Sequence, residues 1–136
     1  MNILKYSIAG LPWFALYLAA TLALFAVFLF IYVQITPYRE IALIREGNSA
    51  AAASISGAML GFVIPLANAV IQSSNIADMI MWALVALVVQ LLVYCVVSRI
   101  IPDMARGIPD GKVAHGMFLG AVSVATGILN AACITY

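Results

Sequence analysis

Hydrophobic residues fill most of the chain, and charged residues interrupt them at only a few places. Four stretches contain no Asp, Glu, Lys or Arg: those between Lys5 and Arg39, between Glu46 and Asp78, between Asp78 and Arg99, and after Lys112. An apolar helix of about 20 residues crosses the hydrocarbon core of a bilayer. Each stretch is long enough, so the pattern predicts four transmembrane helices, at about residues 10–34, 51–73, 79–98 and 114–134.

Composition strengthens this interpretation. The 136 residues are 66% hydrophobic and 8% charged, and the mean hydropathy is +1.16, whereas a soluble domain is about 25% charged. We therefore expect one all-α, polytopic domain over residues 1–136, embedded in the lipid bilayer. The first apolar run is too long for a signal peptide, so we expect it to be retained as a helix. A net charge of +1 provides no basic patch for a nucleic-acid partner.

The distribution of basic residues predicts which side of the membrane each loop faces. The two longer loops carry five of the six basic residues: Arg39, Arg45, Arg99, Arg106 and Lys112. The short loop "QSSNIAD" between the second and third helices carries none. Basic residues in short loops stay on the cytoplasmic side. The longer loops are therefore predicted to be cytoplasmic, and both termini are predicted to be periplasmic.

The first and second halves of the chain show the same order of features. Each longer loop opens with a proline and closes on an acid–glycine pair, and the helix after it contains a GxxxG pair and ends near an Asn-Ala step: Pro37 and Pro102, Glu46-Gly47 and Asp110-Gly111, Asn68-Ala69 and Asn130-Ala131. This order predicts two successive helical hairpins that form a parallel internal repeat. The alternative is that the loops resemble each other because Pro and Gly punctuate helices generally.

The first longer loop contains a segment with some helical character, residues 37–46. Ile41 and Ile44 share one face of such a helix, and Glu40 lies among the polar residues. The pattern fits a short helix lying in the membrane interface. It fits a cytoplasmic extension of the first helix almost as well.

Small residues follow one face of the second helix and one face of the fourth, through the segments "GAMLG" and "GMFLG". A glycine inside a helix costs about 1 kcal/mol relative to alanine. Inside a membrane, however, small residues allow helix backbones to approach closely. The predicted helix-packing residues are Gly57, Gly61, Gly116, Gly120 and Gly127. The first helix is bulky nearly all round, so we expect it to face lipid.

Few polar groups occur inside the predicted helices, and they are the best candidates for function: Asn68, Gln90, Ser123, Thr126 and Asn130. Such groups either form hydrogen bonds between helices or line a path across the membrane. Pro65 removes one backbone hydrogen bond from the middle of the second helix, which makes it a candidate hinge.

The chain contains no recognisable catalytic or metal-binding pattern. It has one histidine, no carboxylate inside the predicted helices, and no Cys/His cluster with the spacing of metal ligands. His115, at the inner start of the fourth helix, is either an interfacial residue or a proton-sensitive group. We therefore expect a protein that is not an enzyme and that has no metal and no cofactor.

Three segments, "IREGNSAAAASISGAMLGFVIPLANAV", "WALVALVVQLLVY" and "GILNAACIT", carry a resemblance to a known family. From about Tyr32 to the C-terminus the chain is similar to the YjfL family of small uncharacterised bacterial inner-membrane proteins, a domain of unknown function. The resemblance implies a polytopic inner-membrane protein with four helices. It implies no catalytic residue and no substrate. The family's genomic neighbourhood, near phage-shock-like membrane-stress proteins, implies a role in envelope maintenance and a cytoplasmic membrane-stress partner.

Two classes of function fit these features. The first is a small homo-oligomeric channel or transporter, in which the polar residues line a path between subunits. The second is a non-conducting membrane scaffold whose cytoplasmic basic loops recruit a protein partner or anionic lipid. A chain of four helices is too small to enclose a wide path by itself, so the first class requires several copies. We favour the first class slightly.

Overall fold

The computed structural model describes residues 2–134, and within them the chain forms seven helices and no strand. The helices are α1 (Asn2–Ala9), α2 (Leu11–Ile35), α3 (Glu40–Arg45), α4 (Ser49–Gln72), α5 (Ile76–Ile100), α6 (Pro102–Gly107) and α7 (Val113–Cys133). Four spans are long and apolar enough to cross a membrane: Asn2–Ile35, Ser49–Gln72, Ile76–Ile100 and Val113–Cys133. The prediction of an all-α protein with four transmembrane helices is confirmed.

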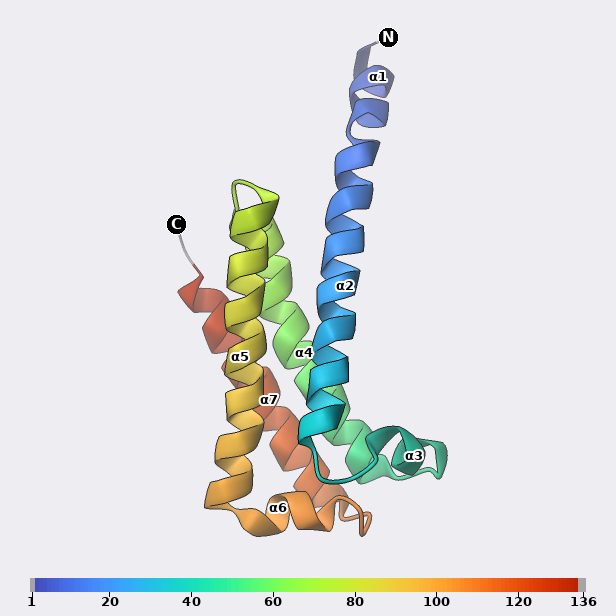
Figure 1. Ribbon diagram of the computed structural model, residues 1–136, viewed down its shortest axis with the longest axis vertical. Coiled ribbons are helices and arrows are strands. Elements are labelled where there is room, and N and C mark those ends of the chain that lie inside the picture. The colour runs from blue at the N-terminus through green and yellow to red at the C-terminus, as the bar shows by residue number, and fades with distance from the viewer. Residues whose placement is uncertain (1, 135–136) are drawn as a thin grey trace.

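The long helices alternate in direction (Figure 1). The two described ends of the chain, Asn2 and Ile134, therefore lie toward the same end of the bundle as the α4–α5 loop, and α3 and α6 lie at the opposite end. The terminal residues Met1 and Tyr136 lie outside the described part. After α1, each half of the chain contains a long, a short and a long helix in that order, and the duplication of one hairpin stays a prediction.

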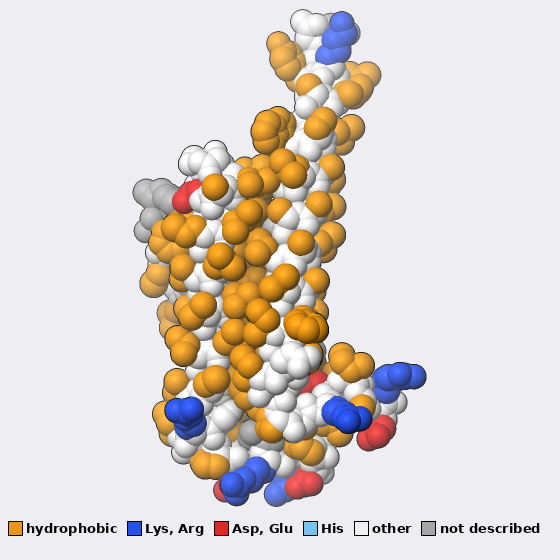
Figure 2. Space-filling view, in the orientation of Figure 1, with side chains coloured by type: hydrophobic (Ala, Val, Ile, Leu, Met, Phe, Trp, Pro, Cys, Tyr) orange, Lys and Arg blue, Asp and Glu red, His pale blue; other side chains and the backbone are white. Residues whose placement is uncertain are grey.

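The centre of the bundle is formed by α4 and α7, with α5 packed across both of them. By contrast, only Phe28 and Tyr32 of α2 are buried, near the end of the helix that leads to α3. Phe28 stacks on Phe62 of α4, with ring centroids 4.6 Å apart. In Figure 1, α1 and the first part of α2 extend past the other helices. Many apolar side chains of α1 and α2 are exposed (Figure 2), in agreement with the uniformly bulky sequence, while others such as Leu24 and Phe25 are partly buried against the core.

Side-chain caps decide where two of the long helices begin. The Asn75 side chain accepts a hydrogen bond from the Asp78 N–H at 2.9 Å, so α5 begins at Ile76 and not at 79. Asp78 then lies in the first turn, where the helix dipole favours a carboxylate. Asn48 accepts from the Ala51 N–H at 3.0 Å and starts α4 at Ser49. The helical turns of α1 also begin well before the predicted residue 10.

A tight turn precedes each of the two central helices. Gly47 and Gly111 occupy the left-handed region there, with φ of +88° and +77°, a conformation in which a Cβ atom is unfavourable. The Asn48 amide nitrogen also donates to the Ile108 carbonyl at 2.9 Å. This bond links the turn before α4 to the turn before α7, and so fixes how the two central helices start side by side.

Candidate functional site

The glycines of α4 and α7 face each other across the central interface. A Cβ atom placed on a glycine would overlap the opposite backbone at several levels: Gly116 against Ala50, Gly57 against Gly120, and Gly127 against Gly61. These contacts progress in the same direction along both helices, so α4 and α7 pack in parallel. The two stripes of small residues therefore pack against each other within one chain, and they leave no space for a lumen between α4 and α7.

Gln90 connects the three central helices at the middle of this interface. It is fully buried on α5, and its Nε2 atom donates to the Gly61 carbonyl of α4 and to the Ser123 carbonyl of α7, both at 3.0 Å. Pro65 has no N–H to offer the Gly61 carbonyl four residues earlier. The Gln90 amide thus replaces a backbone donor that the proline removes, while α4 stays helical across Pro65.

The other intramembrane polar residues lie apart from Gln90. Asn68 donates through Nδ2 to the carbonyls of Ala131 at 2.6 Å and Ile134 at 3.1 Å, and so holds the end of α7 against α4. The Nδ2 atom of Asn130 is buried and has no hydrogen-bond partner among the described residues. Thr126 lines a shallow, mostly apolar depression between α5 and α7. The structure brings Gln90 and Ser123 together. The five candidate polar residues do not form one continuous polar path.

His115 fastens the start of α7 to α6. Its Nδ1 atom lies 2.9 Å from the Asp103 carbonyl. A carbonyl only accepts, so Nδ1 is the donor in this bond. The ring packs against Gly107, where a Cβ atom would overlap it. His115 is therefore held in a defined position at the end of the bundle near α6.

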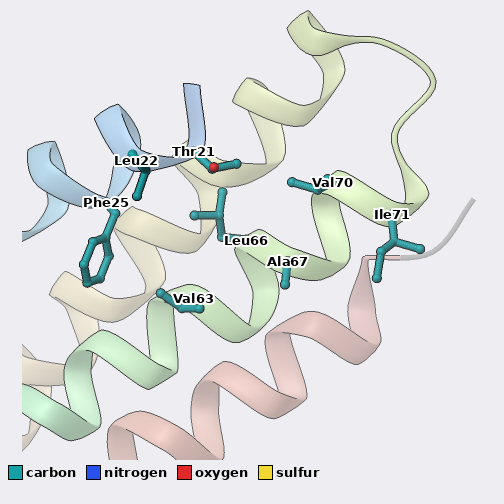
Figure 3. Close-up of a pocket in the computed structure, with 8 residues that line it drawn as sticks. All are labelled: Thr21, Leu22, Phe25, Val63, Leu66, Ala67, Val70 and Ile71. Carbon is teal, nitrogen blue, oxygen red and sulfur yellow. The ribbon is translucent and has the colours of Figure 1, made fainter. Parts of the chain in front are cut away.

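An apolar groove runs between α2 and α4 where these helices diverge (Figures 1 and 3). Eight residues line it: Thr21, Leu22, Phe25, Val63, Leu66, Ala67, Val70 and Ile71. Lipid tails are as apolar as these side chains. The groove is therefore suited to ordinary contact with acyl chains and marks no site by itself.

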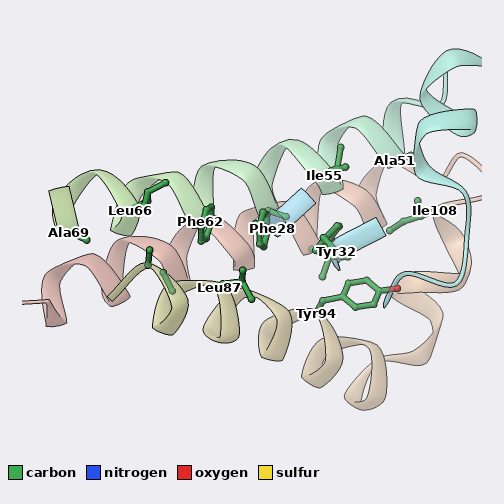
Figure 4. Close-up of a cluster of buried hydrophobic side chains, with 14 of the residues drawn as sticks. Phe28, Tyr32, Ala51, Ile55, Phe62, Leu66, Ala69, Leu87, Tyr94 and Ile108 are labelled. Carbon is green, nitrogen blue, oxygen red and sulfur yellow. The ribbon is translucent and has the colours of Figure 1, made fainter. Parts of the chain in front are cut away.

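A cluster of buried polar groups lies at the end of the bundle near α3. Glu40 is 1% exposed, and around it lie Tyr32 of α2, Tyr38 of the α2–α3 loop and Tyr94 of α5, with Ser54 of α4 beside the tyrosines. Tyr32 and Tyr94 meet edge to face, with ring centroids 5.6 Å apart (Figure 4). Both Glu40 oxygens, the three tyrosine hydroxyls and the Ser54 hydroxyl lack a hydrogen bond of good geometry within the described chain.

Burial controls the protonation of this cluster. Removal from water raises the pKa of the Glu40 carboxyl to about 8, because burial disfavours the charged form, and the neighbouring Tyr38 hydroxyl opposes the rise. Burial also raises the pKa of the Tyr38 hydroxyl, and the nearby tyrosines and Glu40 raise it further. Glu40 therefore holds its proton at neutral pH, and the cluster is a set of neutral hydroxyl and carboxyl groups.

The sequence did not predict this cluster. The pattern of residues 37–46 placed Glu40 among the polar residues, yet its side chain is buried in the bundle. Ile41 is 59% exposed, as the apolar face of a short helix lying in the membrane interface would be. A helix of six residues is too short for its own pattern to show which face meets the bundle. The sequence did contain one indication of the cluster: Tyr32 and Tyr94 carry a hydroxyl on an aromatic ring and lie toward the ends of apolar helices.

The five basic residues of the longer loops lie together at the α3–α6 end of the bundle. Figure 2 shows Lys and Arg side chains there, below an apolar belt. All five are exposed: Arg39, Arg45, Arg99, Arg106 and Lys112. We call this end of the bundle the basic end. Glu40 lies buried beneath its surface.

Comparison of the chain with known proteins identifies its family. The family model described as Domain of Unknown Function (DUF350) matches residues 6–134. The chain belongs to this family. Two relatives carry the name UPF0719 inner membrane protein YjfL, one from Escherichia coli strain K12 and one from Escherichia coli O157:H7. Each is 43% identical over 123 residues, which cover 90% of this chain and 93% of the relative. No solved structure matches the chain significantly.

The resemblance to the YjfL family is thereby confirmed. The name of the relatives and the four apolar spans together establish an integral, multi-pass protein of the inner membrane.

Proposed function

We propose that this DUF350 member is a small transporter-like protein that works as a homo-oligomer and binds and releases a proton at Glu40. The observation that supports this proposal is the burial of one carboxyl among three tyrosine hydroxyls at the basic end. Ionisable groups inside the membrane mark ion and proton pathways, and the Glu40 carboxyl lies against the ends of two spans, near Tyr32 of α2 and Tyr94 of α5. The proposed role includes no chemical step on a substrate, so the protein acts without being an enzyme and without a cofactor.

The packing of the central helices supports an oligomer as the working unit. Glycine contacts close the space between α4 and α7, and Gln90 occupies the middle of the interface. A path through the membrane then runs between copies, along the outer faces of α2 and α5. In this arrangement Gln90 and Ser123 hold the helices together and do not line the path.

A flux measurement tests the proposal. Purified protein in liposomes is given a pH gradient, and a dye inside the vesicles reports its decay; a panel of small ions is tested in the same way. We expect wild type to dissipate the gradient faster than empty liposomes, and Glu40→Gln to abolish the difference. Glu46→Gln changes an exposed carboxylate of the same loop and should behave as wild type. Flux no greater than that of empty liposomes for every ion would refute transport.

We also propose that the basic end faces the cytoplasm and that both termini face the periplasm. The proposal rests on the five exposed basic residues at one end of the bundle and on the positive-inside rule. A reporter that is active only in the cytoplasm should be inactive when fused to the C-terminus and active when inserted after Gly111. The reverse pattern would show that the orientation is inverted.

The exposed basic side chains favour one alternative, a non-conducting scaffold that recruits a cytoplasmic membrane-stress protein. Such a partner would bind the surface of the basic end, so reversing its charges would abolish recruitment. Replacing buried Glu40 by Gln would leave recruitment unchanged. The two variants therefore distinguish the scaffold from the transporter.

A further inference from the structure

A pocket of about 560 Å³ with a mixed polar and apolar lining lies at the end of α2, in the turn that leads to α3. Its polar lining consists of Gln34, Thr36, Tyr38, Arg39, Glu40 and Arg45. The Thr36 hydroxyl already donates to the Val33 carbonyl at 3.2 Å. The hydroxyl of Tyr38 and both oxygens of Glu40 are buried. The side chains left to bind a ligand at the pocket surface are therefore the Gln34 amide and the two guanidinium groups.

The position of the pocket places it at the boundary between lipid and water. It begins directly beyond the uncovered apolar face of α2, where Phe30 is 65% exposed and Ile35 is also exposed. The apolar side chains of Val33 and Ile41 form part of its wall. A ligand in this position touches hydrocarbon on one side and the basic end on the other, as a lipid headgroup and its first acyl carbons do.

The charge of the pocket favours an anion. Arg39 and Arg45 are exposed and form no ion pair with a described residue. The only carboxyl in the lining, Glu40, holds its proton at neutral pH because burial raises its pKa. The lining therefore carries two positive charges and no negative one. Arginine binds phosphate oxygens through several N–H groups at once.

We propose that this pocket binds the phosphate headgroup of one anionic phospholipid, with Arg39, Arg45 and Gln34 donating to its oxygens and an acyl chain lying along α2. The sequence suggested only a general attraction of the basic loops for anionic lipid. The structure instead selects two of the five basic residues, because Arg99, Arg106 and Lys112 do not line the pocket. This inference is independent of whether the protein transports a solute.

The protonation of Glu40 links lipid binding to pH. The groups near its carboxyl are Tyr32 of α2, Tyr38 of the loop and Tyr94 of α5, with Arg39 and Arg45 in the pocket lining. At high pH the carboxylate would face the lipid phosphate and repel it. Wild type should therefore release the lipid as the pH rises through the raised pKa of Glu40, and Glu40→Gln should retain it.

The experiment uses the full chain, purified in detergent from membranes and analysed by native mass spectrometry. Phosphatidylglycerol and phosphatidylcholine with identical acyl chains are added in separate titrations. We expect one tightly bound phosphatidylglycerol and no comparable phosphatidylcholine. Arg39→Gln with Arg45→Gln should weaken phosphatidylglycerol binding about tenfold or more, because one charge-assisted hydrogen bond lost corresponds to about a factor of ten. Arg45→Gln alone should give an intermediate loss.

A matched pair of variants and a competitor make the test decisive. Arg99→Gln with Arg106→Gln removes the same charge from the basic end outside the pocket and should leave lipid binding unchanged. Equal losses in the two double variants would show diffuse charge attraction and overturn the proposal. Displacement of the lipid by millimolar inorganic phosphate would show a site for a free anion, and equal binding of phosphatidylcholine would exclude recognition of an anionic headgroup. Both results would also overturn it.

Discussion

The Nε2 atom of Gln90 donates, at 3.0 Å, to the carbonyl of Gly61, which Pro65 leaves without a donor in its own helix. In a bilayer an unpaired carbonyl has no water to bind, so the loss of this donor is costly. A proline in one helix is thus compensated by a carboxamide on another, and the same carboxamide also binds the Ser123 carbonyl of α7.

This relationship predicts coupling between Gln90 and Pro65. Gln90→Leu should destabilise the protein by about 1–2 kcal/mol, because it leaves the Gly61 carbonyl unpaired. Pro65→Ala restores a backbone N–H four residues after Gly61 and should reduce the cost of Gln90→Leu. A double-mutant cycle of unfolding in detergent measures this coupling. Additive effects would show that Gln90 stabilises the bundle without replacing the missing N–H.

The central glycines predict a large difference between two alanine substitutions. Gly57→Ala should cost about 1–3 kcal/mol, because its Cβ atom overlaps the Gly120 backbone and α4 and α7 must move apart. Gly10→Ala is the control, since a Cβ atom there approaches no closer than 3.5 Å to the Ser7 carbonyl oxygen. Thermal unfolding in detergent compares the two variants. Similar melting temperatures would mean that the α4–α7 contact is looser than described.

The raised pKa of Glu40 predicts how stability depends on pH. The folded state holds the Glu40 proton more tightly than the unfolded chain, in which the pKa of this glutamate is about 4.5. The bound proton therefore stabilises the folded state fully when the pH is below that value, and this stabilisation is lost as the pH rises toward 8. Relative to Glu40→Gln, wild type should therefore lose melting temperature across this interval.

Glu46→Gln is the control for this measurement, because Glu46 is exposed in the same loop. Its profile should keep the slope of wild type. If wild type and Glu40→Gln gave parallel profiles, Glu40 would not be the group that takes up the proton.

The two asparagines predict unequal effects. Asn68→Leu removes both hydrogen bonds to the end of α7 and should cost about 1–2 kcal/mol, with faster amide exchange at residues 131–134. Asn130→Leu should be nearly neutral, because its buried Nδ2 atom has no partner among the described residues. Equal losses of stability and equal exchange in the two variants would contradict this assignment.

Local sequence pattern determined the fold class because hydropathy reflects the solvent of each segment independently of its neighbours. The gaps between charges predicted four spans, and the spacing of Gly57 and Gly61 predicted which face of α4 is small. The caps were less apparent: Asn75 moves the start of α5 to Ile76, and this shift appears only when its side chain is seen to bind the Asp78 N–H.

Tertiary structure alone decided which groups meet. Gln90 is separated by 29 residues from one acceptor and by 33 from the other, and no local pattern encodes that convergence. Glu40 is polar in a polar loop, yet the loop folds it under α2 and α5, where burial changes its protonation. Periodicity shows that one face of a helix carries small or polar residues. Which helix packs against that face depends on how the whole chain folds across the membrane.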